Sequence, residues 1–385
     1  MADRHPLVPY GARAWAEVDL DVAARNCRVL RGRLREGTRV MAVLKADAYG
    51  HGAVAAARRL LREGVDMIGV GDSTEAIELR EAGVTAPLLV LGAIVPGEVE
   101  KVVAYGVAAS IHSQSRVEAL AAAAEAQGRR APVHLKVDTG MGRLGASPAV
   151  AVEIARGLAS HPHLSFEGVA THYASAASPV PFQTSSQFEA FRSVLDALRA
   201  EDLLPPLVHA SSTAAVLGAL REHFSMVRLG GGVWGIDPGN LDGSGVDLEP
   251  ALSLRTQVIF LKDFPAGSPI GYHRTHETRR PARIATLPLG YNDGYAWGLG
   301  NRASALVRGR RCPVVGAVSM DYTTVDVTDA PGVEVGDVVT LVGRDGDEEV
   351  RVEDLARLLA TTPYEVTCRL GKRVVRVPVE ANGAP

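Results

Sequence analysis

The stretch MAVLKADAYGHG (41–52) places one lysine between an apolar run and a series of small residues. Lys45 follows the run, and Tyr49, Gly50, His51 and Gly52 come shortly after it. Taken alone, a lysine at the end of a strand is usually a solvated surface group. At the mouth of a packed core it could act as a nucleophile, so the rest of the chain must decide between these interpretations.

The length and charge of the chain limit the classes of protein to consider. The chain has 385 residues, of which 46% are hydrophobic. At roughly 150 residues per domain, this length predicts two or three domains, or one large barrel with a smaller unit. The net charge of -3 and the aromatic content of 5% argue against a nucleic-acid partner, which would need a basic surface with stacking side chains.

Cysteine usage and the N-terminal sequence indicate a protein of the cytoplasm. Cys27, Cys312 and Cys368 fit no zinc-ligand spacing, so no metal site is predicted, and so sparse a set is typical of a reducing compartment. The N-terminus lacks the apolar core of a signal peptide, and no run approaches the ~20 apolar residues of a membrane span. We therefore expect a cytoplasmic α/β enzyme or binding protein with no membrane partner.

Short β-branched runs alternate with helical stretches over the first two thirds of the chain. Strands are predicted at 39–44, 66–70, 87–91, 106–111, 132–137, 164–171, 206–210 and 225–229. Helices are predicted between most of them, for example at 73–83, 114–128, 148–160 and 185–201. Eight buried strands with helical crossovers are typical of a (β/α)8 TIM-like barrel, and a doubly wound sheet is the alternative.

The sequence changes character after about Gly243. Short Val, Thr and Ile runs separated by Gly, Pro and Asp predict strands within 252–264, 283–290, 304–328, 337–343 and 373–380, and one helix is predicted at 352–360. The α/β chain is thus expected to divide into a barrel over 14–243 and a mostly-β domain over 244–385, with residues 1–13 packing against the second. The strand that begins near Trp15 could belong to either domain.

Polar side chains follow the predicted strands at the end where barrels build their active sites. In chain order these are Lys45, Lys136, Arg143, His172, Ser211, Ser212, Thr213 and Arg228, and the last strand also leads into Gly230–Gly232. Alone, the histidine would be a hydrogen-bonded structural residue and the arginines would form salt bridges. One polar group at each of several strand ends instead favours a functional site.

The last two strand ends indicate a phosphate ligand. Hydroxyl groups after the seventh strand and glycines after the eighth provide donors and backbone N–H groups that neutralise phosphate without a lysine. A phosphate site facing Lys45 suggests pyridoxal phosphate, which forms a Schiff base with a lysine. A phosphorylated substrate without any cofactor is the alternative.

Six motifs together resemble the fold-type III alanine racemases: AVLKADAYGHG, KVDTGMGRLG, THYA, VRLGGGVWG, PLGYNDGY and SMDYTTVDVT. They occur in the family's order from about Trp15 to Pro378. The resemblance implies an N-terminal barrel that binds pyridoxal phosphate and a C-terminal β domain. It also implies a homodimer in which the barrel of one chain and the β domain of the other form each active site.

The resemblance assigns roles to individual positions. Lys45 matches the lysine that holds the cofactor and acts as one catalytic base, and Tyr272 in IGYHRT matches the second base. Arg228 matches the arginine at the pyridine nitrogen, and His172 matches the histidine that links this arginine to the tyrosine. The other cofactor positions are Tyr49, Ser212, Thr213, Gly230, Gly231 and Tyr364.

The resemblance also implies substrate contacts. Arg143, Met320 and Asp321 match positions around the substrate carboxylate, and Tyr291 matches the substrate entrance. Lys136 matches a lysine that can be carbamylated in relatives.

The implied reaction interconverts L- and D-alanine with two bases on opposite faces of Cα, and it would supply D-alanine for peptidoglycan. A phenol ordinarily ionises near pH 10, so cationic groups must favour the phenolate, and His172 and Arg228 are expected to supply the charge.

Departures from the family pattern leave alternatives open. Ser212 stands where asparagine is usual and Ser319 where cysteine is common, so a racemase of serine or another amino acid is one alternative. A pyridoxal-phosphate decarboxylase on the same barrel is a second, although Arg228 stands where such enzymes have an acid. A non-catalytic, one-domain binding protein is a third, and the β domain argues against it.

Overall fold

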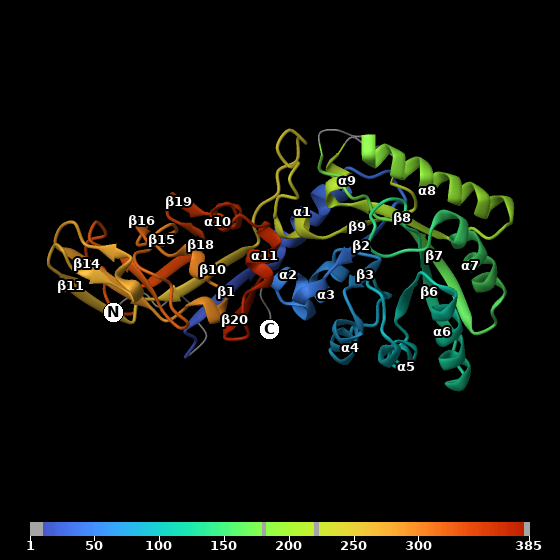
Figure 1. The fold of residues 1–385 in the computed structure, drawn as a ribbon, viewed down its shortest axis with the longest axis horizontal. Helices are drawn as coiled ribbons and strands as arrows, with labels where there is room; N and C mark the ends of the chain where they lie inside the picture. The colour runs from blue at the N-terminus through green and yellow to red at the C-terminus, as the bar shows by residue number, and fades with distance from the viewer. Residues whose placement is uncertain (1–10, 179–181, 219–222, 381–385) are drawn as a thin grey trace.

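The computed structural model describes residues 11–178, 182–218 and 223–380. A closed barrel and a mostly-β part lie at opposite ends of an elongated molecule (Figure 1). Within the described ranges, no helix combines the length and the apolar character that crossing a bilayer requires.

The barrel contains all eight predicted strands. They are parallel, and β9 pairs with β2 to close the sheet, which excludes the doubly wound alternative. Their bounds are β2 Arg39–Val43, β3 Met67–Val70, β4 Leu88–Val90, β5 Ala108–Ile111, β6 Ala131–Lys136, β7 Leu164–Ala170, β8 Leu207–Ser212 and β9 Met226–Leu229.

Helices surround the barrel, and the four predicted as examples are all present. The bounds are α1 Leu20–Arg31, α3 Ala53–Arg62, α4 Ser73–Glu81, α5 Val99–Ala104, α6 Gln114–Ala126, α7 Pro148–Ser160, α8 Phe182–Ala200 and α9 Thr213–Leu217. Helix α4 begins at the predicted residue, because the Asp72 carboxylate accepts from the N–H of Glu75 and caps the first turn.

Strand alternation decides which side chains enter the barrel. In β9, Val227 and Leu229 join the main core under the helices, so Met226 and Arg228 point into the barrel. Arg228 lies nearer the C-terminal end of the strand and therefore faces the barrel mouth. Below it, six strands contribute one apolar side chain each to a separate cluster: Met41, Met67, Leu89, Ala108, Leu207 and Met226.

The C-terminal part consists of mostly antiparallel sheets, as its sequence predicts, and of two short helices, of which the sequence predicts only the one at 352–360. The main sheet has the order β16-β15-β18-β10-β1-β20, with β19 paired to β18, and β11-β14-β17 and β12-β13 form smaller sheets. The bounds are β10 Leu252–Gln257, β11 Phe260–Phe264, β12 Pro269–Ile270, β13 His276–Glu277, β14 Ala282–Leu287, β15 Ser304–Val307, β16 Arg310–Pro313, β17 Thr323–Asp326, β18 Val338–Asp345, β19 Glu348–Val350, α10 Val352–Leu359, α11 Pro363–Cys368 and β20 Val374–Val379.

The strand that contains Trp15 joins the C-terminal sheet. This strand, β1 (Ala14–Asp19), pairs antiparallel with β10 and parallel with β20, and it leads directly into α1 on the barrel. The division into 14–243 and 244–385 stays a prediction, and β1 is an exception to it. Of the segment 1–13, residues 1–10 lie outside the described residues, while the carbonyl of Arg13 accepts from Thr256 on β10.

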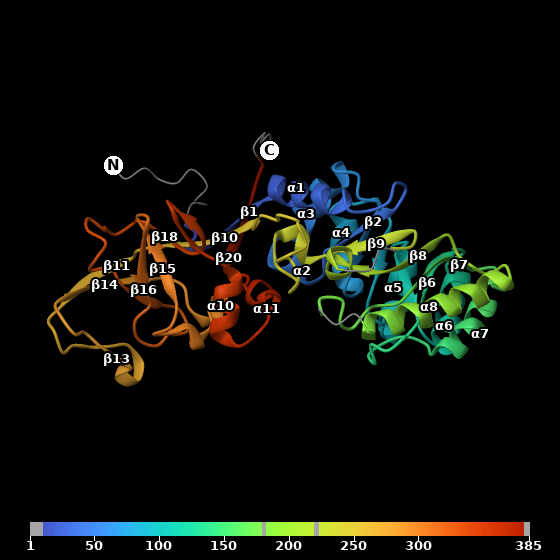
Figure 2. The same cartoon turned by 90° about the horizontal axis from the view of Figure 1, so that it is seen from above.

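Two features of this arrangement position the site. Helix α11 lies between the two parts (Figure 2) and packs against α2 (Lys45–Gly50) at the barrel mouth. The short helix η3 (Tyr272–Arg274) connects β12 to β13, and Figure 2 shows β13 at the end of the molecule farthest from the barrel strands.

Candidate active site

One open cavity at the barrel mouth gathers most of the predicted site residues. From the barrel it is lined by Lys45, Tyr49, Lys136, Arg143, His172, Ser212, Thr213, Arg228, Gly230 and Gly231, and from α11 by Tyr364. The cavity also includes Cys368 and Glu365, which the sequence analysis did not select. Glu365 is the only carboxylate among the described residues that line it, so the cavity is strongly cationic and suits anionic ligands.

Lys45 is followed by a backbone turn that the sequence does not predict. Ala46, Asp47, Ala48 and Tyr49 all have φ between 52° and 58°, and together they form a left-handed helical turn. The left-handed conformation costs about 1–2 kcal/mol for each residue that is not glycine, and it normally occurs at single residues. Four in succession must therefore be held by contacts around the turn.

Side chains within the motif supply part of that support. The Asp47 carboxylate accepts from the N–H of Ala53 at 2.7 Å and so caps α3. The Nδ1 of His51 lies 2.9 Å from the carbonyl oxygen of Ala48 and 3.0 Å from that of Tyr49, and because both are acceptors this nitrogen carries the proton. The His51 ring also stacks on Trp234, with centroids 4.4 Å apart.

The C-terminal part holds the other end of the turn. Arg376 on β20 donates from Nε to the carbonyl of Gly50 at 3.1 Å and from Nη2 to the carbonyl of Leu370 at 2.7 Å. Gly50 lies directly against α11, where any Cβ would clash with the carbonyl oxygen of Thr367. The small residues after Lys45 therefore let the turn and α11 approach each other.

The environment of Lys45 favours a neutral amine. Burial lowers the pKa of Lys45, and the nearby Arg143 lowers it further. The Nζ atom lies 6.0 Å from the centroid of the Tyr49 ring. A lowered pKa increases the fraction of neutral amine, and the neutral amine is the form that attacks a carbonyl or accepts a proton.

Glycines and hydroxyl groups form a cradle at the other side of the cavity. A Cβ on Gly230 would lie 2.5 Å from Tyr49 Oη, and a Cβ on Gly231 would clash with the ring of Tyr364. Burial raises the pKa of both tyrosines, that of Tyr364 to about 12, so both hydroxyls keep their protons and can donate. Thr213 adds a third hydroxyl, which accepts from the N–H of Gly230 at 3.1 Å.

Arg228 is buried within a set of neutral partners. Its Nη1 donates to Nδ1 of His209 at 2.7 Å, and its Nη2 lies 3.0 Å from Nδ1 of His172. Nη2 also reaches the carbonyl oxygens of Thr171 and Ala210, at 2.9 and 2.7 Å. Burial lowers the pKa of Arg228 to about 10, so the guanidinium keeps its charge at neutral pH.

These contacts assign the histidine tautomers, because a guanidinium can only donate. His209 and His172 each accept at Nδ1, so each carries its proton on Nε2 while neutral. The Nε2–H of His209 then donates to Nδ1 of His134 at 2.9 Å. His209 and His134 were missed in the sequence, although both point into the barrel at the same alternation as Leu207 and Lys136 on their own strands.

His172 is neutral, which differs from the cationic histidine that we expected. Burial lowers its pKa to about 2, and the charges of Arg228 and Lys136 act in the same direction. Arg228 is therefore the cation of this pair, and His172 presents an Nε2–H donor to the cavity. The pKa of Lys136 is itself lowered to about 7, first by burial and then by Arg228.

The four remaining predicted residues belong to the β part and do not line the cavity. Tyr272, Tyr291 and Met320 are exposed, with 69%, 44% and 54% of their surface accessible. The Asp321 carboxylate is already engaged, because Arg373 donates to it at 2.7 Å while also holding Asp293. Asp321 therefore anchors its own loop.

The two serines that depart from the family pattern differ in their surroundings. Ser212 lines the cavity at the start of α9. Ser319 lies in the β part, where its hydroxyl donates to the carbonyl of Tyr322 at 2.9 Å and accepts from the N–H of the same residue at 3.0 Å. Only Ser212 is placed to alter the cavity of its own chain.

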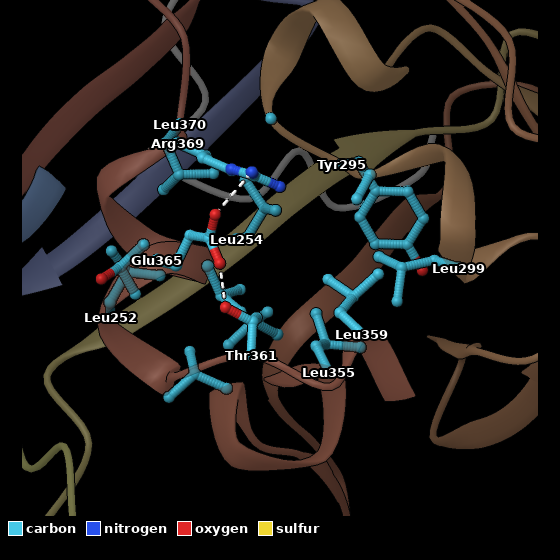
Figure 3. A pocket seen from close by; sticks show the side chains of 16 residues that line it. Leu252, Leu254, Tyr295, Leu299, Leu355, Leu359, Thr361, Glu365, Arg369 and Leu370 are labelled. Carbon is cyan, nitrogen blue, oxygen red and sulfur yellow. Dashed lines mark hydrogen bonds and ion pairs between the residues drawn. The ribbon is translucent and has the colours of Figure 1, made fainter. Parts of the chain in front are cut away.

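A second pocket lies behind α11 and has a different character (Figure 3). Three of its polar side chains pair with one another, since Thr361 donates to Glu365 and Arg369 forms an ion pair with Glu365 at 2.5 Å. The buried hydroxyl of Tyr295 has no hydrogen-bond partner among the described residues. The rest of the labelled lining is Tyr295 and the leucines Leu252, Leu254, Leu299, Leu355, Leu359 and Leu370. It lacks the reactive groups of the first cavity and is a packing defect beside it.

Within the described ranges, no three or more His, Cys, Asp or Glu side chains gather as metal ligands would.

Comparisons with known proteins agree over both parts of the chain. The family model "Alanine racemase, N-terminal domain" matches residues 18–238, and "Alanine racemase, C-terminal domain" matches residues 251–378. The alanine racemase of Symbiobacterium thermophilum is 43% identical over 362 residues, which are 94% of this chain and 96% of that protein.

Solved structures give the same result. The alanine racemase of Clostridium difficile 630 has a TM-score of 0.93 and 31% identity, over 97% of this chain and 98% of that one. The alanine racemase from Bartonella henselae with covalently bound pyridoxal phosphate has a TM-score of 0.83 and 27% identity, over 95% of this chain and 99% of that one.

The close contact of Gly50 with α11 predicts a large loss of stability for Gly50→Ala. The left-handed backbone (φ +84°) should cost about 1–2 kcal/mol, and the clash with Thr367 about 1–3 kcal/mol more. Gly37→Ala is the matched control, because Gly37 has φ +80° and nothing within 4 Å of an added Cβ. Urea unfolding measures both variants, and equal losses would contradict the contact.

The buried histidines predict that the cofactor-free protein loses stability as pH falls below 6.5. Burial lowers the pKa of His51 and His134 to about 4, so they stay neutral in the fold. In the unfolded chain a histidine binds a proton near pH 6.5, so the unfolding free energy should fall by up to ~1.4 kcal/mol per pH unit for each of them.

Urea unfolding between pH 7.5 and 5 tests this dependence. His134→Gln, which cannot be protonated, should reduce the slope by one histidine's share. An unfolding free energy that does not change over this range would contradict the neutral histidines.

Proposed function

We infer that this chain, which belongs to the alanine racemase family, is an enzyme that interconverts L- and D-alanine. The observation that carries this conclusion is the cavity at the barrel mouth, which Lys45, the glycine cradle and the Arg228 guanidinium all line. Matches that cover both parts of the chain support it.

We propose pyridoxal 5'-phosphate as the cofactor, since the residues of the cavity fit its parts. The close approach of Gly230 and Gly231 to two protonated tyrosines provides a cradle with hydroxyl donors for the phosphate. Lys45, Thr213 and Ser212 line the same cavity, and the amine of Lys45 suits the aldehyde carbon. Arg228 suits the ring nitrogen. When bound, this cofactor delocalises the electron pair that remains after the Cα proton leaves.

Lys45 is proposed as the base on one face of the substrate. When it is not bonded to the cofactor, Lys45 would be a free amine, and its lowered pKa would favour the neutral form that accepts a proton. In the family this face carries the proton of the D-enantiomer. In the opposite direction, from L- to D-alanine, the ammonium form of Lys45 would donate a proton to Cα on this face.

Tyr272 is proposed as the base on the other face, supplied by a second copy of the chain. Its exposure and its place in η3, at the end of the molecule away from the barrel, support a homodimer with shared active sites. Tyr291 and Met320, exposed on the same part, would line the entrance and the carboxylate side of that shared site. Asp321 would act through its ion pair with Arg373.

His172 and Arg228 are proposed to stabilise the tyrosine as a phenolate. The Nε2–H of His172 would donate to the phenolate oxygen, while its Nδ1 accepts from Arg228. The positive charge thus stays on Arg228. The neutral His172 would link this charge to the phenolate oxygen through its two hydrogen bonds. Because Arg228 keeps its proton and its partners are neutral, the ring nitrogen beside it would remain unprotonated.

Arg143 and Lys136 are proposed to act on the substrate carboxylate. Arg143 lines the cavity with an exposed guanidinium that can pair with a carboxylate. The pKa of Lys136 near 7 leaves part of its amine neutral, and a neutral amine can add CO2 and release a proton to form a carbamate. That anion would offset the positive charges of Arg143 and Arg228, and it would orient the Arg143 side chain.

The alternatives have less support. A decarboxylase would need an acid at the ring nitrogen, and Glu365, the one carboxylate among the described residues of the cavity lining, is held by Arg369. Racemisation of serine has only Ser212 in its favour, since Ser319 is occupied within its own turn. A cytoplasmic location and a role in supplying D-alanine for peptidoglycan are proposed from the sequence features and the family.

The direct test is to incubate the protein and pyridoxal phosphate separately with L-alanine, L-serine and L-lysine, and to resolve the products by enantiomer. We expect D-alanine, with serine converted much more slowly. Lys45→Ala should lose the absorbance of lysine-bound cofactor and at least ~10³-fold of activity. Lys101→Ala, which removes an exposed lysine from α5, should change neither. Release of CO2 without any D-product would establish the decarboxylase instead.

A further inference from the structure

Glu75 on α4 connects the ends of two neighbouring barrel strands. Its Oε1 accepts from the N–H of Ala46 at 2.6 Å, and its Oε2 accepts from the N–H of Gly71 at 2.7 Å. Ala46 opens the left-handed turn after β2, and Gly71 directly follows β3, which pairs with β2. One carboxylate thus binds the backbone at both strand ends.

The carboxylate also lies close to the base of the Lys45 side chain. A Cβ built on Gly71 would be 3.3 Å from Glu75 Oε2 and 3.5 Å from Lys45 Cβ. Glu75 and the start of the lysine side chain therefore flank the same glycine. Any movement of the Ala46 N–H would carry Lys45 with it, because the two residues are adjacent in the chain.

Glu75 is itself held in place. Its N–H donates to the Asp72 carboxylate at 3.0 Å, which fixes the first turn of α4. Ser73 in the same turn donates through its hydroxyl to Glu98 at 2.6 Å. The carboxylate is therefore preorganised toward the two strand ends by the helix on which it lies.

We propose that Glu75 is a positioning residue that holds the left-handed turn 46–49 against the end of β3 and so sets where the Lys45 amine and the Tyr49 hydroxyl lie. The proposal rests on the roles given above to these two residues. Arg376 anchors the turn at Gly50, and Glu75 anchors it at Ala46. A turn of four unfavourable residues needs both ends fixed.

Loss of Glu75 should affect the turn before it affects any chemistry. Without its acceptor the Ala46 N–H is no longer held, and the turn can relax toward ordinary backbone conformations. The Lys45 amine and the Tyr49 hydroxyl would then no longer be set for the two ends of one cofactor. We expect weaker cofactor binding and faster opening of this segment in the cofactor-free protein.

The test compares Glu75→Ala, Glu75→Gln and the control Glu78→Ala, which removes the same charge from the exposed face of the same helix. Hydrogen exchange followed by mass spectrometry measures segment 44–52 in the cofactor-free protein. Titration with pyridoxal phosphate measures cofactor affinity by absorbance. Circular dichroism and thermal melting confirm that each variant is folded.

In the Glu75→Ala variant, the backbone amides of segment 44–52 should exchange at least tenfold faster than in the parent protein. The variant should also bind the cofactor at least tenfold more weakly. Glu75→Gln should fall between, because its amide replaces one of the two accepting oxygens with an NH2 group, which cannot accept from a backbone N–H. Glu78→Ala should match the parent protein. If Glu75→Ala exchanges segment 44–52 and binds the cofactor as Glu78→Ala does, Glu75 does not position the turn.

These outcomes are separable from a failure of the proposed function. Exchange of segment 44–52 depends on neither the cofactor nor the substrate, so it would report on Glu75 even if alanine were not racemised. Conversely, if Lys45→Ala kept the absorbance of lysine-bound cofactor, the role of Lys45 would fail while the effect of Glu75 on the turn would stand.

Discussion

The left-handed turn that follows Lys45 is the constraint on which the rest of the site depends. It reverses the chain within a few residues, so that the amine of Lys45 and the hydroxyl of Tyr49 both line one cavity. This conformation is unfavourable, and contacts from both parts of the molecule maintain it. Because Gly50 must touch α11, the turn also fixes Tyr364 beside the glycine cradle.

The electrostatics of the cavity follow from burying several cations together. Lys45, Lys136 and Arg228 all have lowered pKa values, and the surrounding histidines are neutral. Each group gives up protons more readily because burial and its neighbours disfavour further charge. Such a site is best satisfied by anions, and the phosphate of the proposed cofactor and a substrate carboxylate would provide them.

Much of this architecture could be predicted from the sequence. Short runs of apolar, β-branched residues indicate the buried strands, and polar residues mark where the strands end. The eight barrel strands and the inward position of Arg228 follow from alternation alone. The turn at 46–49 could not be predicted, since alanine and tyrosine disfavour left-handed backbone and the contacts from Glu75, Arg376 and α11 that help to hold it come from distant parts of the chain. The neutrality of His172 and the ion pair of Asp321 likewise depend on neighbours distant in the chain.

The central claim is that Lys45 and Tyr272 act in one site although Lys45 lies at the barrel mouth and Tyr272 lies in the β part of the chain. The decisive measurement mixes Lys45→Ala and Tyr272→Phe subunits, each nearly inactive alone, and assays D-alanine formation after native mass spectrometry has verified subunit exchange. A shared site predicts that the mixed dimer regains one intact site, and random mixing should then restore about a quarter of the parent activity. Verified mixed dimers that remain inactive would contradict the account.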